Sequence, residues 1–249
     1  MQNSDRGLEF TSIVARDIPD AWFQAVHANV RVGHVYKITR GSYEDSERSE
    51  FDSFSVRITH PEVRPFEPDI PAHFGFPDPV APGYIDTYFQ EKLLIGVRDD
   101  NEDYVYGERL SGIVVKRHNI DGKVVWDDPI EVGPNQIEMV IAMYKKSGYG
   151  TNQATMEVGR PEDILLIDPP CLRIIDTRVR YGRLHFFVYF RSWDLWGGFP
   201  ANLGAIQLLK EYMAEQIGIP PGETYAFSKG LHLYGYVMDM ARIRTAFSE

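Results

Sequence analysis

The sequence predicts an α/β protein in which strands and helices build one domain. Runs that alternate apolar and polar residues, typical of half-buried strands, occur in both halves of the chain, and segments with apolar residues at helical spacing lie between them. At 249 residues, with 43% hydrophobic residues, the chain is long enough for one sizeable core or at most two small ones. No internal repeat interrupts these patterns.

The first third of the chain predicts one helix, two strands and a long loop. Asp17 provides a helix cap and an apolar face follows it, so we expect a helix over residues 17–29. The runs VRVGHVYKI and FDSFSVRI, on either side of the polar segment 41–50, predict strands. The proline-rich stretch 61–82 is too rigid and aromatic for a flexible linker and predicts an ordered surface loop.

Helices and strands also alternate through the rest of the chain. Apolar residues recur at helical spacing in three segments, so we expect helices over residues 84–94, 134–146 and 203–218. The runs CLRIIDTRVR and RLHFFVYF predict two strands joined by a hairpin at Tyr181-Gly182. A last strand is expected over residues 224–238.

The composition excludes several classes of protein. With 26 Lys and Arg against 36 Asp and Glu, the net charge is −10, which argues against polymeric nucleic acid as a partner but leaves room for a small anion at a few local arginines. No apolar run approaches the ~18 to 20 residues of a membrane span and no signal-peptide pattern is present, so we expect a cytoplasmic protein with no membrane partner. The single cysteine and the scattered histidines predict neither a disulfide nor a metal site.

Cys171 is the candidate nucleophile. It opens the first strand of the predicted hairpin and Arg191 follows the second strand, so pairing brings the two residues close together. A neighbouring guanidinium lowers the pKa of a thiol and makes the thiolate available, as a cysteine nucleophile requires. Two simpler interpretations stay open: a free cysteine is usually a small buried hydrophobic residue, and Arg191 can pair with Asp194 at the strand end.

Three further residues carry groups that suit a nucleotide. Asn202 stands where a helix cap belongs, and its amide offers the acceptor and donors that could read the O4 and N3 edge of a pyrimidine. His232 and Tyr234 lie on one face of a predicted strand, where an imidazole and a hydroxyl suit sugar hydroxyls. Each residue also has a plain structural interpretation, as a helix cap or as a half-buried ring.

Four short motifs in the last third of the chain carry a family resemblance. They are Asp168-Pro-Pro-Cys171, Arg191-Ser192-Trp-Asp194, Gly-Gly-Phe-Pro200-Ala-Asn202 and His232-Leu-Tyr234. In type and in separation, with 20 residues from the cysteine to the arginine, then 3, 8 and 30, they resemble the thymidylate synthase and pyrimidine hydroxymethylase family. Farther upstream, Val105-Tyr106-Gly107 is similar to the family's Val-Tyr-Gly turn, and Gln90-Glu91 resembles the helix of its catalytic glutamate. Short archaeal-type synthases and the cytidylate hydroxymethylases of nucleoside-antibiotic pathways look nearest.

The resemblance implies a fold and a mechanism. The fold would be a thymidylate synthase-like single domain over residues 1–249, with a large mixed sheet and packing helices, in a homodimer. A pyrimidine nucleotide and a reduced folate would be the small-molecule partners. Cys171 would add to C6 of the pyrimidine, and C5 would then attack the methylene carbon of 5,10-methylenetetrahydrofolate.

The resemblance also implies a role for each site residue. Arg191 would bind the phosphate and keep the thiolate charged, with Ser192 and Arg48 as further phosphate contacts. Asp194 would hold the pterin of the folate, and Glu91 would relay protons through water. The remaining substrate-binding residues would be Tyr106, Asn202 at the pyrimidine edge, and His232 with Tyr234 at the ribose.

Two departures from the family pattern bear on the reaction. The family's pair of adjacent arginines, donated across its dimer interface, is missing here, and Lys145, Lys146 or Arg160 could substitute for it. No tryptophan lies between Trp22 and Trp126, and the C-terminal residues do not resemble the tail that shields the methylene intermediate in the synthases. A less shielded methylene group would be captured by water, which favours a hydroxymethyl product.

Three functions therefore stay open. The first is C5 hydroxymethylation of a pyrimidine 5′-nucleotide, with cytidylate (CMP or dCMP) as the preferred substrate. The second is methylation of dUMP to dTMP, because Asn202 matches the residue that accepts uracil in the synthases. The third is a catalytically idle relative that only binds nucleotide, because the arginine pair is missing.

Overall fold

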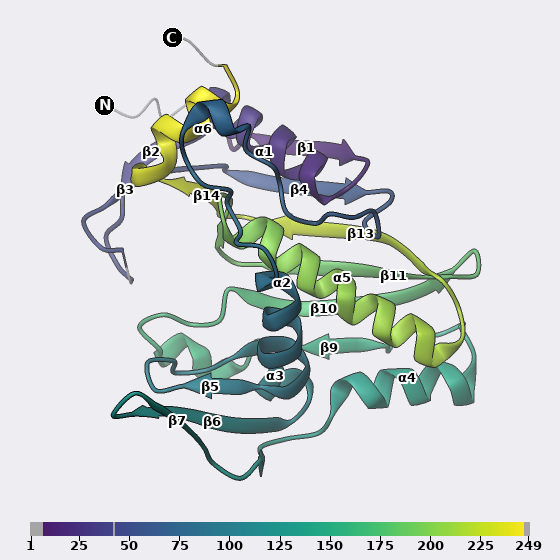
Figure 1. The fold of residues 1–249 in the computed structure, drawn as a ribbon. Helices are drawn as coiled ribbons and strands as arrows, with labels where there is room; N and C mark the ends of the chain where they lie inside the picture. Colours follow the sequence, from purple (N-terminus) through teal and green to yellow (C-terminus); the bar gives the residue numbers. More distant parts are fainter. Residues whose placement is uncertain (1–6, 42, 247–249) are drawn as a thin grey trace.

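A large mixed sheet forms the centre of the protein (Figure 1). The computed structural model describes residues 7–41 and 43–246, so the end of the C-terminal tail lies outside it. Within these ranges the sheet has six strands in the order β1-β4-β13-β11-β10-β9. They are β1 (Phe10–Ala15), β4 (Ser53–Ile58), β9 (Thr155–Glu157), β10 (Leu172–Arg180), β11 (Arg183–Phe190) and β13 (Pro221–Ser228). The pairs β1–β4 and β13–β11 are parallel and the other three are antiparallel, which confirms the α/β class and the predicted mixed sheet.

Helices pack on one face of this sheet. They are α1 (Ile18–Val32), α2 (Tyr84–Tyr88), α3 (Tyr106–Leu110), α4 (Gln136–Ser147), α5 (Gly198–Ile217) and α6 (Met238–Arg244). Short helical turns elsewhere in the chain are Ala72–Phe74, Pro161–Leu165 and Gly235–Val237. The predicted cap is confirmed, since the Asp17 carboxylate accepts from Asp20 N at 3.0 Å. The helix expected over residues 84–94 is also present, but it widens after α2 into a π-helix, Phe89–Ile95.

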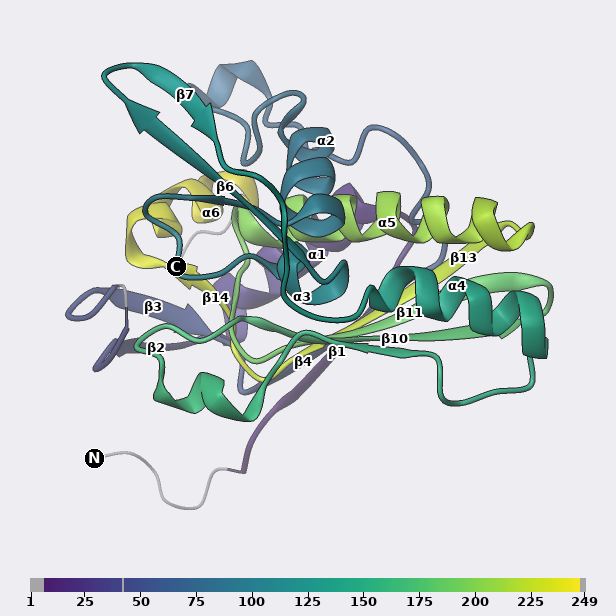
Figure 2. The same ribbon diagram turned by 90° about the horizontal axis from the view of Figure 1, so that it is seen from below.

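Two smaller sheets flank the large one. The first has the order β12-β14-β3-β2 and consists of β12 (Trp193–Asp194), β14 (Leu231–Tyr234), β3 (Glu47–Glu50) and β2 (His34–Lys37). The second contains β5 (Val97–Asp99), β6 (Ile113–Ile120), β7 (Lys123–Trp126) and β8 (Ile130–Glu131). The β6–β7 hairpin projects from the body of the protein (Figure 2). Nowhere in the described part of the chain does a helix have the length and apolar character needed to cross a membrane.

The β10–β11 hairpin is present as predicted and positions the candidate nucleophile. Its two turn residues adopt left-handed backbone angles, with φ of 53° at Tyr181 and 71° at Gly182. Such a turn matches the twist of the flanking strands. Pairing then continues to Leu172 opposite Phe190, so Cys171 and Arg191 lie at the same end of the sheet.

Several predicted boundaries were wrong. Residues Val30–Val32 continue α1 rather than starting a strand, and β1 and β3 were not predicted. The run 224–238 is two strands in two different sheets, β13 and β14, because the chain leaves the large sheet at Lys229-Gly230. Helix α5 begins at Gly198 rather than at residue 203, and this shift changes the interpretation of Asn202.

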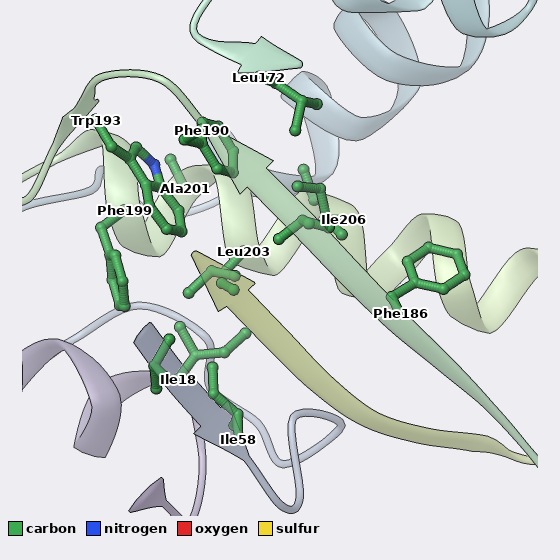
Figure 3. Packing of buried hydrophobic residues seen from close by; sticks show 14 of the residues in the cluster. Ile18, Ile58, Leu172, Phe186, Phe190, Trp193, Phe199, Ala201, Leu203 and Ile206 are labelled. Carbon is green, nitrogen blue, oxygen red and sulfur yellow. The ribbon is translucent and has the colours of Figure 1, made fainter. Parts of the chain in front are cut away.

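The core between α5 and the large sheet positions the site residues. Figure 3 shows Phe186, Phe190 and Leu172 facing Leu203 and Ile206 of α5. Trp193 lies flat against Phe190, with ring centroids 3.9 Å apart. Burial of each such side chain stabilises the fold by roughly 1.5 to 3 kcal/mol, which holds the start of α5 firmly against the ends of β10 and β11. The proline-rich loop is ordered, as predicted, because Phe66, Ile70 and Val80 are buried in the same core.

The other face of the large sheet carries no α-helix in the described structure (Figure 2). Burial alternates along β11 and β13, so that Phe186 and Ala226 face the core while Phe187 and Tyr225 face outward. The latter two rings stack at 4.8 Å, and Phe227 beside them is 41% exposed. We refer to this surface, formed by the outward side chains of β1, β4, β13, β11 and β10, as the open sheet face.

Candidate active site

Cys171 immediately precedes β10, beside the last residue of β11. The backbone N–H of Arg191 donates to the carbonyl of Cys171 at 2.8 Å, which extends the hairpin pairing by one bond. The cysteine side chain is partly buried against the core. The predicted proximity of Cys171 and Arg191 is therefore present in the structure.

The Arg191 guanidinium wraps around the segment that leads to the cysteine. Its Nε donates to the Pro170 carbonyl at 3.2 Å, and Nη2 donates to Asp168 Oδ1 at 3.0 Å and to the Pro169 carbonyl. The ion-pair partner of Arg191 is thus Asp168, and the alternative pair with Asp194 is not formed. These bonds fix the approach to Cys171 and leave the charge of Arg191 beside it.

The pKa of the Cys171 thiol is the net result of opposing effects. Burial raises it, and the nearby positive charges of Arg191, Arg173 and Arg48 lower it, whereas Asp168 raises it. Burial outweighs the arginines, so the pKa of the thiol lies above its ordinary value. Arg191 lowers the pKa as the sequence predicted, but desolvation of the thiolate raises it by more than the guanidinium charges lower it.

Arg48 lies on β3, in the smaller sheet β12-β14-β3-β2, and residues of β2 and β3 hold its side chain. Its guanidinium donates to the Tyr36 hydroxyl, with Nε at 2.7 Å, and Nη2 lies 3.1 Å from Glu50 Oε2. Arg48 pairs in register with Tyr234 across β3 and β14. It therefore lies near the ribose residues that the sequence predicted, and its charge also reaches Cys171.

His232 presents an open acceptor. The ring is only 1% exposed, and its Nδ1 lies 2.8 Å from the Gly230 carbonyl, which can only accept, so Nδ1 carries the proton. Nε2 is then an acceptor, and it is buried without a partner among the described residues. Burial lowers the pKa of His232 to about 4, so the ring is neutral near pH 7. Tyr234 lies edge-on to it at 4.6 Å, on the same face of β14 as predicted.

Asp194 caps helix α5. Its carboxylate accepts from the backbone N–H groups of Trp196 at 3.1 Å, Gly197 at 3.1 Å and Gly198 at 2.8 Å. Burial raises the pKa of this carboxyl, and the three backbone donors lower it in part. Ser192 precedes it in the short link between β11 and β12.

Asn202 lies inside α5 and is not its cap, so that interpretation was wrong. Trp193 Nε1 donates to Asn202 Oδ1 at 2.9 Å, and Asn202 Nδ2 donates to the Tyr88 hydroxyl at 3.1 Å. The helix starts four residues earlier because the Asp194 carboxylate satisfies its first N–H groups. The Asn202 side-chain amide therefore does not cap the helix, and both of its hydrogen bonds are made to side chains.

Three tyrosines lie around the nucleophile, of which the sequence predicted only Tyr106. Its hydroxyl accepts from Leu172 N at 3.3 Å. Tyr88, Tyr104 and Tyr106 line a cavity of about 180 Å³, together with Lys92, Glu102 and Val105. Burial above all, and also the nearby Cys171, raises the pKa of each of the three hydroxyls. Two features of the sequence could have pointed to the other two tyrosines as site residues. Tyr104 lies two residues before Tyr106, and Tyr88 lies in the predicted helix that contains Glu91.

Glu91 lies in the π-helix and is held by Arg117. The Arg117 Nη1 donates to both of its carboxylate oxygens, at 2.8 and 2.9 Å, and the same guanidinium binds Asp99. No hydrogen bond or ion pair within the described residues joins Glu91 to Cys171. Its role as a proton relay stays a prediction.

The residues considered as substitutes for the arginine pair lie elsewhere. Lys145 and Lys146 are exposed in the last turn of α4, and Arg160 directly precedes the turn Pro161–Leu165. No bond among the described side chains connects them to the residues around Cys171. Residues 7–41 and 43–246 also contain no cluster of three or more His, Cys, Asp or Glu side chains arranged to hold a metal ion.

Comparison with known proteins identifies the family. A family model described as thymidylate synthase matches residues 94–246, which include every predicted site residue except Arg48 and Glu91. The chain belongs to the thymidylate synthase family. This membership confirms the resemblance drawn from the motifs and accounts for the fold. The enzymes of this family are one-carbon transferases that bind a nucleotide and use methylenetetrahydrofolate as donor.

Two kinds of relative are similar to the chain. A protein of Methanosarcina mazei, named provisionally as a thymidylate synthase, is 29% identical over 228 residues, which are 92% of this chain and 91% of that protein. A homologue of the same name in Methanococcoides burtonii is also 29% identical over 228 residues, 91% of each chain. The deoxyuridylate hydroxymethyltransferase of Bacillus phage SP01 is 40% identical over 154 residues, 61% of this chain and 34% of that protein.

Proposed function

We propose that this member of the family catalyses folate-dependent C5 hydroxymethylation of a pyrimidine 5′-nucleotide, as one domain that spans residues 1–249. The observation that carries the hydroxymethyl product is the cavity beside Cys171. Hydroxyl and charged side chains from Tyr88, Tyr104, Tyr106, Lys92 and Glu102 line it. A polar lining of this kind admits water, which would add to the exocyclic methylene group at C5.

In this proposal the nucleotide is held at three points. Arg191, with Ser192 and Arg48, binds the phosphate, since guanidinium groups form strong charge-assisted bonds to it. The unpartnered Nε2 of His232 accepts from a ribose hydroxyl, beside Tyr234. The Asn202 amide reads the pyrimidine edge and Tyr106 lines the base site. Cys171 adds to C6 as the nucleophile.

The folate fits near the start of α5. Asp194 would hold the pterin, because a partly buried carboxylate is the acceptor that the N–H groups of such a ring require. Its Oδ1 accepts only from Trp196 N and keeps a second lone pair, whereas Oδ2 already accepts from Gly197 N and Gly198 N. When bound, the folate supplies the one-carbon unit. Glu91 is proposed to move protons through water on the side of the base.

The identity of the base is open between cytosine and uracil. The resemblance of the sequence to the cytidylate hydroxymethylases of nucleoside-antibiotic pathways favours cytidylate. Two other observations support a uracil: the Asn202 amide, whose Nδ2 offers a donor on the side of Tyr88, and the name of the phage relative. The archaeal relatives and Asn202 also support thymidylate synthase as a second candidate function.

We also propose that the protein is a homodimer formed through the open sheet face. The stacked Phe187 and Tyr225 and the exposed Phe227 form an apolar patch at its centre, beside the Arg57–Glu223 ion pair, and Phe10 and Val14 on the edge strand β1 are 65% and 62% exposed. Exposed apolar residues gathered on a sheet face are normally covered, and a second copy fits because the surface can pair with itself about a two-fold axis.

Mass analysis of the products tests the function. The protein is incubated with methylenetetrahydrofolate and, separately, with CMP, dCMP, UMP and dUMP. A gain of one CH₂O unit is expected, and the nucleotide that gains it identifies base and sugar. A gain of CH₂ on dUMP, accompanied by formation of dihydrofolate, would instead support thymidylate synthase.

The control is Cys171→Ala, which is expected to abolish any gain while it leaves nucleotide binding intact. If neither protein modifies any of the four nucleotides, although both bind them, the catalytically idle relative is favoured.

A further inference from the structure

Tyr88 holds the Asn202 amide in one orientation. The indole N–H of Trp193 can only donate, so the amide atom 2.9 Å from it must be the oxygen. The amide nitrogen therefore faces the Tyr88 hydroxyl, 3.1 Å away. The usual ambiguity between the two ends of an asparagine amide is removed by the indole. As a result, Tyr88 is an acceptor toward Asn202.

The proton of Tyr88 is consequently available for another partner. Its oxygen already accepts from Asn202, and none of the hydrogen bonds between described residues uses its proton. The hydroxyl lines the cavity of about 180 Å³ with Tyr104 and Tyr106. Cys171 is near enough for its charge to raise the pKa of Tyr88, after burial and the neighbouring Tyr84 and Tyr104. Tyr88 thus keeps its proton at neutral pH and offers a donor on the side of the nucleophile.

We propose that Tyr88 is a catalytic residue, whose hydroxyl donates a hydrogen bond to the same edge of the pyrimidine that Asn202 binds. This inference rests on the proposed function. When the thiolate of Cys171 forms its bond to C6, the π pair of the C5–C6 double bond moves to C5 and is shared with the acceptor on the ring edge, O4 in a uracil or N3 in a cytosine. Negative charge rises at that acceptor, where the Tyr88 O–H stabilises it while tyrosine keeps its proton.

A neutral hydroxyl is well suited to this task. A fixed donor aimed at developing charge in a site of low dielectric is worth about 10²- to 10³-fold in kcat. The donor must not ionise itself, and burial of Tyr88 ensures this. Glu91 makes different contacts from Tyr88, because Arg117 binds both of its carboxylate oxygens. The two residues are therefore separable by substitution.

The test compares Tyr88→Phe with Tyr84→Phe. Phenylalanine keeps the ring contacts of either tyrosine, and Tyr84 is a matched control because it lies on the same helix, with its ring 5.8 Å from that of Tyr88 and an exposure of 49%. Tyr88→Phe is expected to lower kcat by about 10²-fold with little change of KM for the nucleotide, since the bond strengthens only as charge develops. Tyr84→Phe is expected to keep wild-type kinetics. Circular dichroism confirms the fold of both variants.

Three results would overturn the inference. One is a Tyr88→Phe enzyme whose kcat stays within about threefold of wild type, a change far below the expected loss. Another is a rise of KM at unchanged kcat, which indicates uniform binding rather than catalysis. The third, a wild-type protein that modifies none of the four nucleotides, would overturn the proposed function as well. If the wild-type protein turns over a nucleotide and Tyr88→Phe does so at nearly the same rate, the inference about Tyr88 fails while the proposed function stands.

Discussion

At the scale of single residues, the reactivity of Cys171 depends on burial more than on charge. Because burial raises the pKa of its thiol despite Arg191, alkylation by iodoacetamide is expected to follow a pH profile with its midpoint above that of a free cysteine, about 8.5. Arg191→Gln removes a favourable charge and is expected to move the midpoint higher. Mass spectrometry reads the profile directly, since the chain has one cysteine. A midpoint below pH 8, or no shift in the variant, would contradict this balance.

His232 makes stability depend on pH. Its folded pKa of about 4 lies below the ordinary value of 6.5, so the unfolded chain binds a proton that the folded protein excludes. Stability is therefore lost as the pH falls from 6.5 toward 4, by about 2 kcal/mol between pH 7.5 and pH 5. Urea unfolding at the two pH values measures this loss. In His232→Gln, the loss of unfolding free energy between the two pH values is expected to be smaller than in the wild type by about 2 kcal/mol. An equal loss in both proteins would refute the low pKa of His232.

At the scale of elements, the start of α5 depends on one carboxylate. Asp194 accepts three backbone N–H bonds there, so Asp194→Ala is expected to lower the free energy of unfolding by about 1 to 2 kcal/mol, the usual cost of a lost cap. Chemical denaturation measures the change. Asp239→Ala is the control, because the side chain of Asp239 is 93% exposed in the first turn of α6. Equal stability of Asp194→Ala and the control would refute the capping role.

Also at this scale, polar strands were hard to recognise in the sequence. Strand β3 is the segment Glu-Arg-Ser-Glu, which carries no apolar alternation. It forms because β2 and β14 pair with it on both sides, and because Arg48 binds Tyr36 on β2 and Glu50 on β3 itself. Such pairing partners lie far away in the chain, so local patterning could not predict the strand.

At the scale of the whole molecule, the open sheet face predicts the oligomeric state. Phe227→Glu places a charge on this face and is expected to convert the proposed dimer to a monomer, because burial of an unpaired carboxylate in an interface is costly. Sedimentation at micromolar concentration distinguishes the two states. Val124→Glu, on the projecting hairpin at 59% exposure, is the matched control and is expected to stay dimeric. A monomeric wild type would contradict the proposal.

The sequence by itself determined the hairpin, the helical segments that contain α1, α2, α4 and α5, and the family. Strand alternation, helical spacing and the turn at Tyr181-Gly182 are local signals, and the motif separations around Cys171 follow directly from the order of residues. Tertiary structure alone decided the partner of Arg191, the net pKa of the thiol and the orientation of the Asn202 amide. These depend on burial and on contacts between segments far apart in the chain. The hydrogen bond between Asn202 and the Tyr88 hydroxyl is an example, because it depends on the packing of α2 against α5 and has no signal in the local sequence.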